Sequence, residues 1–209
     1  MKSKRILILA PHTDDGEFGC GGSIVRFISE GADVYYAAFS LAEESVPRGF
    51  PKNILKTEVK KATSVIGIRR ENLLLYKYKV RYFASNRQEI LEDLVRLKRE
   101  LDPDLVFMPT LQDLHQDHST IANEGLRAFK QCTILCYEMP WNNLNFYTHC
   151  FVRLGITEID KKVEALSCYE SQKNRYYSSA EFIKSLAVTR GTQVGTGLAE
   201  AFQVGRWII

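Results

Sequence analysis

The chain has 209 residues, of which 45% are apolar and 25% are charged, as is usual for a globular protein with a full hydrophobic core. Its 28 basic and 25 acidic side chains leave a net charge of only +3, and no basic block is dense enough to follow a nucleic-acid backbone. The apolar run at residues 6–10 is too short for a signal peptide or a membrane span. Composition therefore argues against a nucleic-acid partner and against an integral membrane segment.

The chain contains five cysteines and no C-x-x-C pair. Cys132 and Cys136 lie four residues apart in a predicted strand, so we expect them on the same face with no partner ligand nearby. An odd number of unpaired thiols is typical of a reduced, cytoplasmic protein with buried cysteines. We therefore expect a cytoplasmic location.

Short apolar runs alternate with amphipathic segments over the first 140 residues. The runs predict strands at residues 6–10, 34–40, 72–76, 105–108 and 133–137. The amphipathic segments predict helices at residues 23–30, 53–66 and 118–131. A further helix is expected to begin at a capping box formed by Asn86 and Glu89 and to end before Pro103.

This alternation predicts a three-layer α/β/α, Rossmann-like fold with a mostly parallel sheet. After about residue 140 the alternation breaks down. A strand at 146–154, helices at 157–169 and 180–188, and an extended segment at 199–209 are expected there. No repeat, low-complexity tract or linker is visible, so we interpret residues 1–209 as one domain with a C-terminal elaboration from about residue 140.

Two polar loops each follow a predicted strand. The first reads "PHTDDGEFGCGG" from residue 11, and the second reads "TLQDLHQDHS" from residue 110. In open parallel sheets, ligands bind outside the carboxyl ends of the strands. Three of the four histidines, His12, His115 and His118, lie in these loops, whereas His149 in a predicted strand is interpreted as structural. The clustering indicates a functional site.

The residue types in the two loops suit a catalytic zinc ion, which takes three protein ligands and keeps one open position. His12, Asp15 and His118 can supply two imidazoles and one carboxylate. Asp14 then remains free to act as a base on water at the metal. His115 is expected to act near the reacting carbonyl.

Asp117 is expected to hydrogen-bond a ring nitrogen of His115 and to fix its tautomer.

Each loop alone is compatible with a polar turn or a helix cap, but the two together favour a metal site. A nucleotide-phosphate loop is disfavoured, because the spacing G-x-G-x-x-G fails and no Walker Lys-Ser or Lys-Thr pair is present. Gly19, Gly21 and Gly22 are instead expected to let the turn and the first helix approach the sheet closely.

The motifs resemble those of the LmbE-like, or PIG-L, family of N-acetylglucosaminyl deacetylases. "APHTDDGEFGCGG" is similar to the family pattern A/P-H-P-D-D-E-x-x-G-x-G-G, and "DLHQDHS" to H-P-D-H. "KVEALSCYESQ" and "TRGTQVGTGLAEAF" resemble later family segments, so the resemblance spans about residues 5–205. It implies an LmbE-like fold with His12, Asp15 and His118 as zinc ligands and Asp14 as the general base. His115 would stabilise the oxyanion and help the amine to leave.

The chain departs from the family motifs at several positions. Thr13 and Gln116 replace prolines, and Gly16 stands where the family has glutamate, with Glu17 one position later.

Another departure concerns substrate binding. Where many members have an R-x-x-E pair at the start of a helix, this chain reads L-K-T-E at 55–58. Arg48 and Arg190 are therefore the candidates for a substrate-anchoring arginine.

We therefore expect a zinc-dependent hydrolase that removes the N-acetyl group from a small molecule or glycoconjugate containing N-acetylglucosamine. Acetate and a free amino sugar would be the products, and another divalent metal such as Fe²⁺ could replace Zn²⁺. A homo-oligomer is compatible with the resemblance. The alternatives are a metal-dependent hydrolase of another N-acyl amide and a non-catalytic, metal- or nucleotide-binding Rossmann-like module. Asp14 and His115 argue against a pure metal binder, which needs neither.

Overall fold

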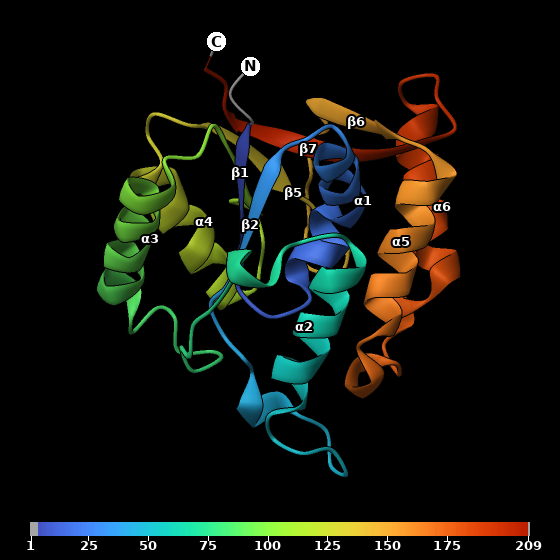
Figure 1. Ribbon diagram of the computed structural model, residues 1–209. Coiled ribbons are helices and arrows are strands. Elements are labelled where there is room, and N and C mark those ends of the chain that lie inside the picture. The colour runs from blue at the N-terminus through green and yellow to red at the C-terminus, as the bar shows by residue number, and fades with distance from the viewer. Residues whose placement is uncertain (1–3, 209) are drawn as a thin grey trace.

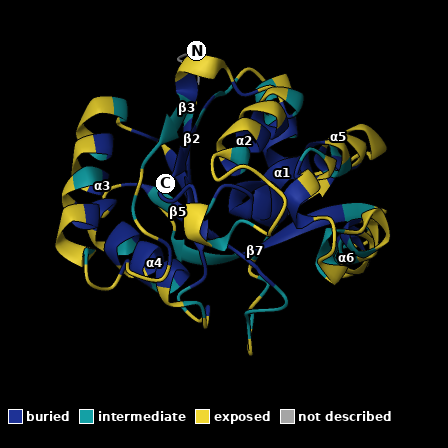
Figure 2. Cartoon of the chain, turned by 90° about the horizontal axis from the view of Figure 1, so that it is seen from below, coloured by how far each residue is buried: buried dark blue, intermediate teal, exposed yellow. Residues whose placement is uncertain are grey.

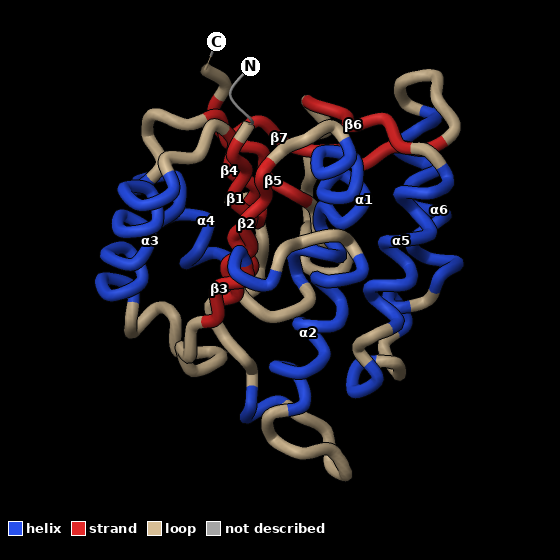
Figure 3. Tube along the Cα trace, in the orientation of Figure 1, coloured by secondary structure: helices blue, strands red, loops and turns tan. Residues whose placement is uncertain are grey.

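The computed structural model describes residues 4–208 and contains one seven-stranded sheet with the order β3-β2-β1-β4-β5-β7-β6 (Figure 3). Strands β1 to β5 run parallel, and β7 is antiparallel to both of its neighbours. The strands are β1 (Arg5–Ala10), β2 (Asp33–Ala38), β3 (Leu73–Leu75), β4 (Leu105–Pro109), β5 (Thr133–Tyr137), β6 (Cys150–Leu154) and β7 (Leu198–Arg206). The predicted α/β class with a mostly parallel sheet is confirmed.

Helices cover both faces of the sheet, as Figure 1 shows. They are α1 (Asp15–Ser29), α2 (Ile54–Val65), α3 (Arg87–Leu101), α4 (Gln116–Ala128), α5 (Ile156–Ser167) and α6 (Ala180–Thr192). Helices α3 and α4 pack on one buried apolar cluster, and α1, α2, α5 and α6 pack on another. The two clusters on opposite faces make the predicted three-layer arrangement. Short 3-10 turns lie at Glu43–Ser45, Arg70–Asn72, Glu170–Gln172 and Tyr176–Ser178.

The apolar run of β1 reflects burial on both faces of the sheet. Ile6 and Ile8 belong to the cluster under α1, whereas Leu7 and Leu9 belong to the cluster under α3 and α4. Successive side chains of a strand point to opposite faces, so a central parallel strand needs apolar residues at every position. Figure 2 shows the consequence, with buried strands inside and helices exposed only on their outer sides.

Helix α1 begins eight residues earlier than the predicted start at residue 23. It begins at Asp15 and is interrupted at Cys20, whose φ of −149° and ψ of 24° are not helical. Past the interruption, the amides of Gly22 and Ser23 donate to the carboxylate of Glu200 at 3.0 and 2.7 Å. Glycines weaken a helix by about 1 kcal/mol each, but this distant carboxylate supplies the hydrogen bonds that the interrupted helix lacks.

Of the three glycines predicted to allow a close approach to the sheet, Gly19 and Gly22 do so, whereas Gly21 faces Lys162 of α5, and Gly16 makes a further close approach. A Cβ on Gly16 would lie 2.4 Å from the ring of Tyr36, and one on Gly19 would lie 2.4 Å from the ring of Tyr137. Both tyrosines are fully buried, on β2 and β5. The close approach is confirmed, and it gives a steric reason for glycine at position 16.

Some local predictions were wrong. Asn86 precedes α3, but its side chain donates back to the carbonyl of Tyr82 at 2.8 Å and makes no capping bond, so there is no capping box with Glu89. The strand expected from residue 146 begins only at Cys150.

The helix expected at 157–169 spans Ile156–Ser167, where Glu158 accepts the backbone N–H of Gly155 at 2.9 Å. The remaining boundaries agree within a few residues, except that the helix expected at 180–188 extends to Thr192.

The segment after residue 140 adds β6 and β7 to the same sheet and packs α5 against α1. Ile209, within the expected closing segment, lies outside the described residues. All five cysteines are free, and Cys132 and Cys136 lie in the same apolar cluster, as predicted. Within residues 4–208, no helix has the length and apolar character needed to cross a membrane.

Candidate active site and metal centre

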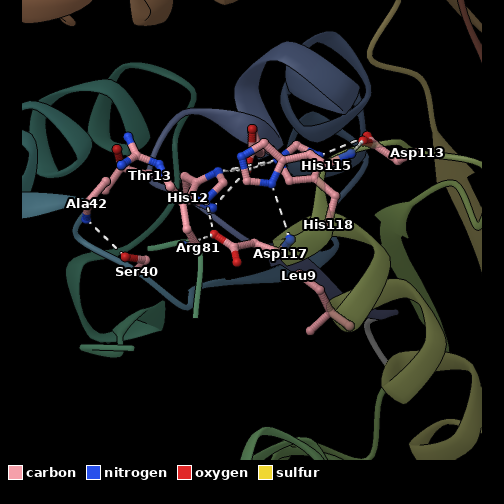
Figure 4. Close-up of polar contacts among 12 residues, drawn as sticks. Leu9, His12, Thr13, Ser40, Ala42, Arg81, Asp113, His115, Asp117 and His118 are labelled. Carbon is pink, nitrogen blue, oxygen red and sulfur yellow. Dashed lines mark hydrogen bonds and ion pairs between the residues drawn. The ribbon is translucent and has the colours of Figure 1, made fainter. Parts of the chain in front are cut away.

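The two polar loops meet at one edge of the sheet, as predicted. Strands β1 and β4 are parallel neighbours, so the loops that follow them lie side by side at their carboxyl ends. The first loop leads into α1 at Asp15, and the second leads into α4 at Gln116. Figure 4 shows His12, His115 and His118 pointing toward one another from these loops.

The three predicted metal ligands converge. Asp15 Oδ2 lies 3.1 Å from His12 Nδ1 and 3.2 Å from His118 Nε2. The two ring nitrogens are 3.3 Å apart. Asp15 and His118 are buried, and His12 is nearly so. Bonds of about 2.0–2.2 Å in a tetrahedral site place zinc ligand atoms roughly 3.3–3.6 Å apart, so the residues present fit a divalent ion after only a small outward movement.

Each histidine of this triad is oriented by a carboxylate on its other nitrogen. His118 Nδ1 lies 2.8 Å from Asp113 Oδ2, and His12 Nε2 lies 3.0 Å from Asp117 Oδ2. Carboxylates in this position fix the tautomer and raise the basicity of a metal-ligating imidazole. The nitrogens left over are the two that face Asp15.

The same carboxylates determine the electrostatics of the triad. Burial lowers the pKa of His118, but the charges of Asp15 and Asp113 overcome this effect and raise the pKa to about 10. Burial raises the pKa of Asp15, but His118 and His12 hold it well below its usual range. The carboxylates around the two imidazoles thus favour positive charge at the centre of the triad.

Asp117 hydrogen-bonds a ring nitrogen of His115, as predicted, but through its backbone N–H and not through its carboxylate. Its carboxylate contacts His12 and accepts the backbone N–H of Arg81 at 2.7 Å. The ring of His115 accepts the backbone N–H of Asp117 at Nδ1, at 3.2 Å. Asp117 is the second residue of α4 and His115 precedes the helix as its N-cap, so the amide of Asp117 points back toward His115 while its side chain contacts His12 in the first loop.

The hydrogen bonds of His115 define its neutral form. Because Nδ1 accepts the amide of Asp117, the proton of a neutral ring resides on Nε2. Burial, with the charges of His12 and His118, lowers the pKa of His115 to about 4. His115 therefore offers an oxyanion a neutral Nε2–H donor and not a charged imidazolium. Ring nitrogens of His12, His115 and His118 lie within 4.8 Å of one another, so His115 is also close enough to reach a metal.

Asp14 is the carboxylate that the triad leaves free. It precedes α1 but makes no capping bond to the helix, and it is 7% exposed. Burial and the charge of Asp15 raise its pKa, while Arg175 and His12 oppose the rise. A buried carboxylate that makes no capping bond and lies beside a triad of candidate metal ligands is suited to proton transfer.

These residues face a cavity of about 350 Å³, a size suited to a small ligand. Phe18, Trp141 and Tyr177 form an aromatic wall of this cavity. Trp141 stacks on Tyr177 with ring centroids 3.8 Å apart and planes inclined by 9°. Leu55, the first residue of the L-K-T-E segment, also lines the cavity.

The arginines of the cavity are not the two that the sequence suggested. Arg48 is exposed and does not line the cavity. Arg190 does not line it either, and forms an ion pair with Glu138 in which the two charged groups are 2.6 Å apart. Arg81 and Arg175 line the cavity instead. Arg175 follows the segment "YESQ" by three residues, and that proximity was the only sequence signal for it.

A buried network beneath the first loop was also missed. The hydroxyls of Tyr36 and Tyr169 both donate to the carbonyl of Thr13, at 3.0 and 2.6 Å. Both also contact the carboxylate of Glu17, Tyr169 at 2.9 Å. Burial raises the pKa of Glu17 to about 8. The carbonyl of Thr13 is therefore held from two sides, immediately before Asp14.

The later family segments have a structural role in this chain. Lys162, from "KVEALSCYESQ", pairs with Glu200, from "LAEAF", at 2.6 Å and also donates to the carbonyl of Phe18 at 2.6 Å. Ser171, from the first segment, donates to the buried carboxylate of Glu58 at 2.6 Å. These contacts tie α1 and α2 to the C-terminal elements.

The protein thus has an α/β sheet with a His-Asp-His set and a further buried carboxylate at its carboxyl edge. A family profile described as "PIG-L: GlcNAc-PI de-N-acetylase" matches residues 7–129, more than half of the chain. The chain therefore belongs to the PIG-L, or LmbE-like, family, as its motifs predicted.

Individual relatives are more distant. The chain is 27% identical over 196 residues to a probable N-acetyl-alpha-D-glucosaminyl L-malate deacetylase 2 of Bacillus anthracis, covering 82% of this chain and 83% of the relative. The N,N'-diacetylchitobiose deacetylase of Pyrococcus horikoshii superposes with a TM-score of 0.81 at 19% identity, over 97% of this chain and 84% of that one.

The fold alone does not select the reaction. The 4-carboxy-2-hydroxymuconate hydratase GalB of Pseudomonas putida KT2440 superposes with a TM-score of 0.80 at 17% identity, over 99% of this chain and 98% of that one. At such identities the likeness concerns architecture. The residues of the site therefore carry the evidence for function.

Proposed function

We propose that this protein is a metal-dependent deacetylase that hydrolyses the N-acetyl group of a substrate containing N-acetylglucosamine. The observation that carries the proposal is Asp14, a buried carboxylate free of capping bonds beside the triad of His12, Asp15 and His118. A non-catalytic metal-binding module would need the triad but not a free base. Membership of a family described by de-N-acetylation supports the same reaction.

The metal would be held by His12 Nδ1, Asp15 Oδ2 and His118 Nε2. Two imidazoles and one carboxylate form a donor set that zinc accepts, and Fe²⁺ is the alternative. When bound, the ion would act as a Lewis acid that polarises the acetyl carbonyl and acidifies water. Asp113 and Asp117 would keep the two imidazoles oriented, through the 2.8 and 3.0 Å contacts to their outer nitrogens.

Asp14 would take a proton from the water that attacks the acetyl carbon. Its carboxylate lines the cavity beside the triad and makes no capping bond, so it is placed to act as a general base. A new C–O bond forms, and the carbonyl π electrons move onto oxygen. When the C–N bond breaks, the nitrogen takes up a proton, so that acetate and a free amine leave.

His115 would donate from Nε2 to the oxygen that gains charge. Its Nδ1 is occupied by the amide of Asp117, so the neutral ring presents this donor without first binding a proton. A fixed donor aimed at developing charge is worth about 2.7–4 kcal/mol in comparable enzymes. Delivery of the proton to the nitrogen is assigned to Asp14, which holds the proton taken from water.

Two similar proteins are named as deacetylases of N-acetylglucosaminyl malate and of N,N'-diacetylchitobiose. Both contain N-acetylated glucosamine, and this shared unit is the substrate class proposed here. Hydrolysis of a different N-acyl amide is the alternative. A cytoplasmic location and a homo-oligomer remain predictions.

Acetate release tests the proposal. Purified protein, stripped of metal and reloaded with Zn²⁺ or Fe²⁺, is incubated with N-acetylglucosamine derivatives and with N-formyl and N-propionyl analogues. The proposal expects acetate and one free amine per turnover, and activity only after reloading. Faster hydrolysis of another acyl group would favour the alternative, and inactivity with every metal and substrate would overturn the proposal.

A further inference from the structure

The side chain of Thr13, in the first loop, has a buried hydroxyl without a partner. Thr13 stands where the family motif has proline, and it is only 1% exposed. Its Oγ1 is one of three buried side-chain nitrogen or oxygen atoms within residues 4–208 that make no hydrogen bond. Buried polar groups are almost always paired, because an unpaired one destabilises the fold. The hydroxyl of Thr13 therefore needs a physical explanation.

The backbone around Thr13 is firmly held. Its carbonyl accepts hydrogen bonds from the hydroxyls of Tyr36 and Tyr169 at 3.0 and 2.6 Å. The N–H of His12, the residue before it, donates to Asp15 Oδ2 at 2.7 Å. None of these contacts involves Oγ1 of Thr13. The fold thus fixes the residue and leaves its hydroxyl without a partner.

Thr13 lines the active-site cavity. Rotation about χ1 between staggered rotamers exchanges the positions of its Oγ1 and Cγ2, so the hydroxyl can meet a ligand without a backbone movement. Ser45, Asn142 and Gln172 add further uncharged hydrogen-bonding groups to the lining, which also contains the aromatic wall. A pocket with an aromatic surface and a few uncharged polar groups suits a ligand such as a sugar ring.

The position of Thr13 in the chain limits which part of a sugar it can reach. Thr13 directly precedes Asp14, the proposed base, and the Cα atoms of consecutive residues lie about 3.8 Å apart. Its hydroxyl is therefore close to the place of the acetamido group. In a glycoside of N-acetylglucosamine, the free hydroxyl next to that group is the one on C3. A hydroxyl both donates and accepts hydrogen bonds, so the two hydroxyls match.

We propose that Thr13 is a specificity-determining residue whose hydroxyl binds the C3 hydroxyl of the substrate sugar. The inference rests on the proposed deacetylation, because it describes substrate recognition at that same site. A site that hydrogen-bonds a substrate hydroxyl rejects an analogue without it, because a buried polar group is then left unpaired. Proline has no hydroxyl, so the family motif itself does not supply this contact.

Deoxy analogues test which hydroxyl is bound. The metal-loaded protein is given methyl N-acetylglucosaminide and its 3-deoxy and 6-deoxy analogues, and acetate release is followed. We expect kcat/KM for the 3-deoxy analogue to be about tenfold or more below that of the parent compound. The 6-deoxy analogue, which lacks a hydroxyl far from the acetamido group, should resemble the parent. Equal kcat/KM for the parent and the 3-deoxy analogue would overturn the inference while leaving the deacetylase intact.

Variants of Thr13 connect this preference to its hydroxyl. Thr13→Val keeps the shape of the side chain, so kcat/KM for the parent compound should fall about tenfold or more. The variant should no longer distinguish the parent from the 3-deoxy analogue, because the two changes remove the same hydrogen bond. Thr13→Ser keeps the hydroxyl and should keep the preference. A full preference for the parent in Thr13→Val would contradict the proposed contact.

The stability of the ligand-free protein separates a binding role from a structural one. Thr13→Val removes an unpaired buried hydroxyl and should raise Tm. Thr63 provides the matched control, since it is 2% exposed, lies outside the cavity lining and donates from Oγ1 to the carbonyl of Val59 at 2.7 Å. Thr63→Val should not raise Tm and should keep the substrate preference. A lower Tm for Thr13→Val would show a structural partner and overturn the inference.

A binding measurement separates this inference from the proposed function. Calorimetry with metal-loaded Asp14→Asn protein, with and without Thr13→Val, measures the affinity for the parent compound and the 3-deoxy analogue without turnover. A preference for the parent that depends on Thr13, without acetate release by the unaltered protein, would support the contact and refute the deacetylase. Acetate release without such a preference would refute the contact alone, and the absence of both would refute both.

Discussion

The two loops of the site are held in different ways. The loop at residues 113–118 is supported largely by its own residues. Asp113 accepts the N–H of His115 at 2.9 Å and contacts the ring of His118, and the N–H of Asp117 reaches back to His115.

The loop at residues 12–16 depends instead on distant groups. Tyr36 and Tyr169 hold the carbonyl of Thr13, and the pair of Lys162 with Glu200 supports the interrupted helix that follows. The comparison teaches that the second loop supplies more of the bonds that orient its own histidines, whereas the first loop draws more of its support from Tyr169, Lys162 and Glu200 of the C-terminal elements.

The largest expected effect lies where the loops meet. His118→Ala removes the imidazole of the second loop that contacts Asp15 of the first loop. We therefore expect loss of stoichiometric metal and of all measurable acetate release. Metal content after dialysis and a turnover assay check this. His149→Ala, a histidine outside the site whose Nδ1 accepts the N–H of Val204 at 3.3 Å, is the control and should keep both. Stoichiometric metal in His118→Ala would refute the ligand set.

Breaking the distant support of the first loop should cost the next largest amount. Lys162→Met leaves Glu200 as a buried charge without its partner, which destabilises by about 3–5 kcal/mol. Denaturant unfolding measures the loss. The exposed neighbour Lys161 provides the control Lys161→Met, which should change the unfolding free energy by less than about 0.5 kcal/mol. Similar losses for the two variants would show that the buried pair has no special role.

The self-contained loop should respond in metal affinity rather than in stability. Asp113→Asn keeps the shape of the side chain but weakens its support of His118 Nδ1. Loss of such a partner lowers metal affinity about 10–100-fold. Competition with a zinc chelator gives the affinity, and thermal unfolding of the metal-free protein should change little. An unchanged affinity would contradict the orienting role of Asp113.

The smallest expected effect concerns the tyrosines beneath the first loop. Tyr36→Phe and Tyr169→Phe each remove hydroxyl bonds to Thr13 and Glu17, at a cost of about 1–3 kcal/mol. Because both act on the same two acceptors, the double variant should depart from additivity by at least about 0.5 kcal/mol. Tyr35→Phe, whose hydroxyl bonds only Asp33 in the structure, is the control. Strict additivity would mean that the two tyrosines do not form one network.

The difference between the two loops also explains which parts of the site the sequence could predict. Residues 113–118 follow a strand, start a helix and carry their own supporting carboxylate. The local sequence is therefore enough to predict His118 as a candidate metal ligand. The predicted contact between Asp117 and the ring of His115 is made by the backbone, while the side chain of Asp117 reaches His12, a contact that the sequence did not predict. Sequence proximity does not reveal which way a side chain leaves the start of a helix.

The first loop was less predictable for the same physical reason. Its glycines suggested a turn, yet they form a helix because Glu200 accepts the amides of Gly22 and Ser23. Gly16 was unexplained until Tyr36, twenty residues later, proved to occupy the space of its side chain. The arginines of the cavity could not be chosen by sequence either, since their place depends on how distant loops converge.

The most direct test of the central claim is the Asp14→Asn variant, measured for metal content and acetate release on the same sample. Asp14 does not bind the metal in this account, so the variant should hold as much metal as the unaltered protein and turn over about 10²–10⁴ times more slowly. Full acetate release by a metal-loaded Asp14→Asn protein would contradict the assignment of Asp14 as the base, and with it the argument for a deacetylase at this site.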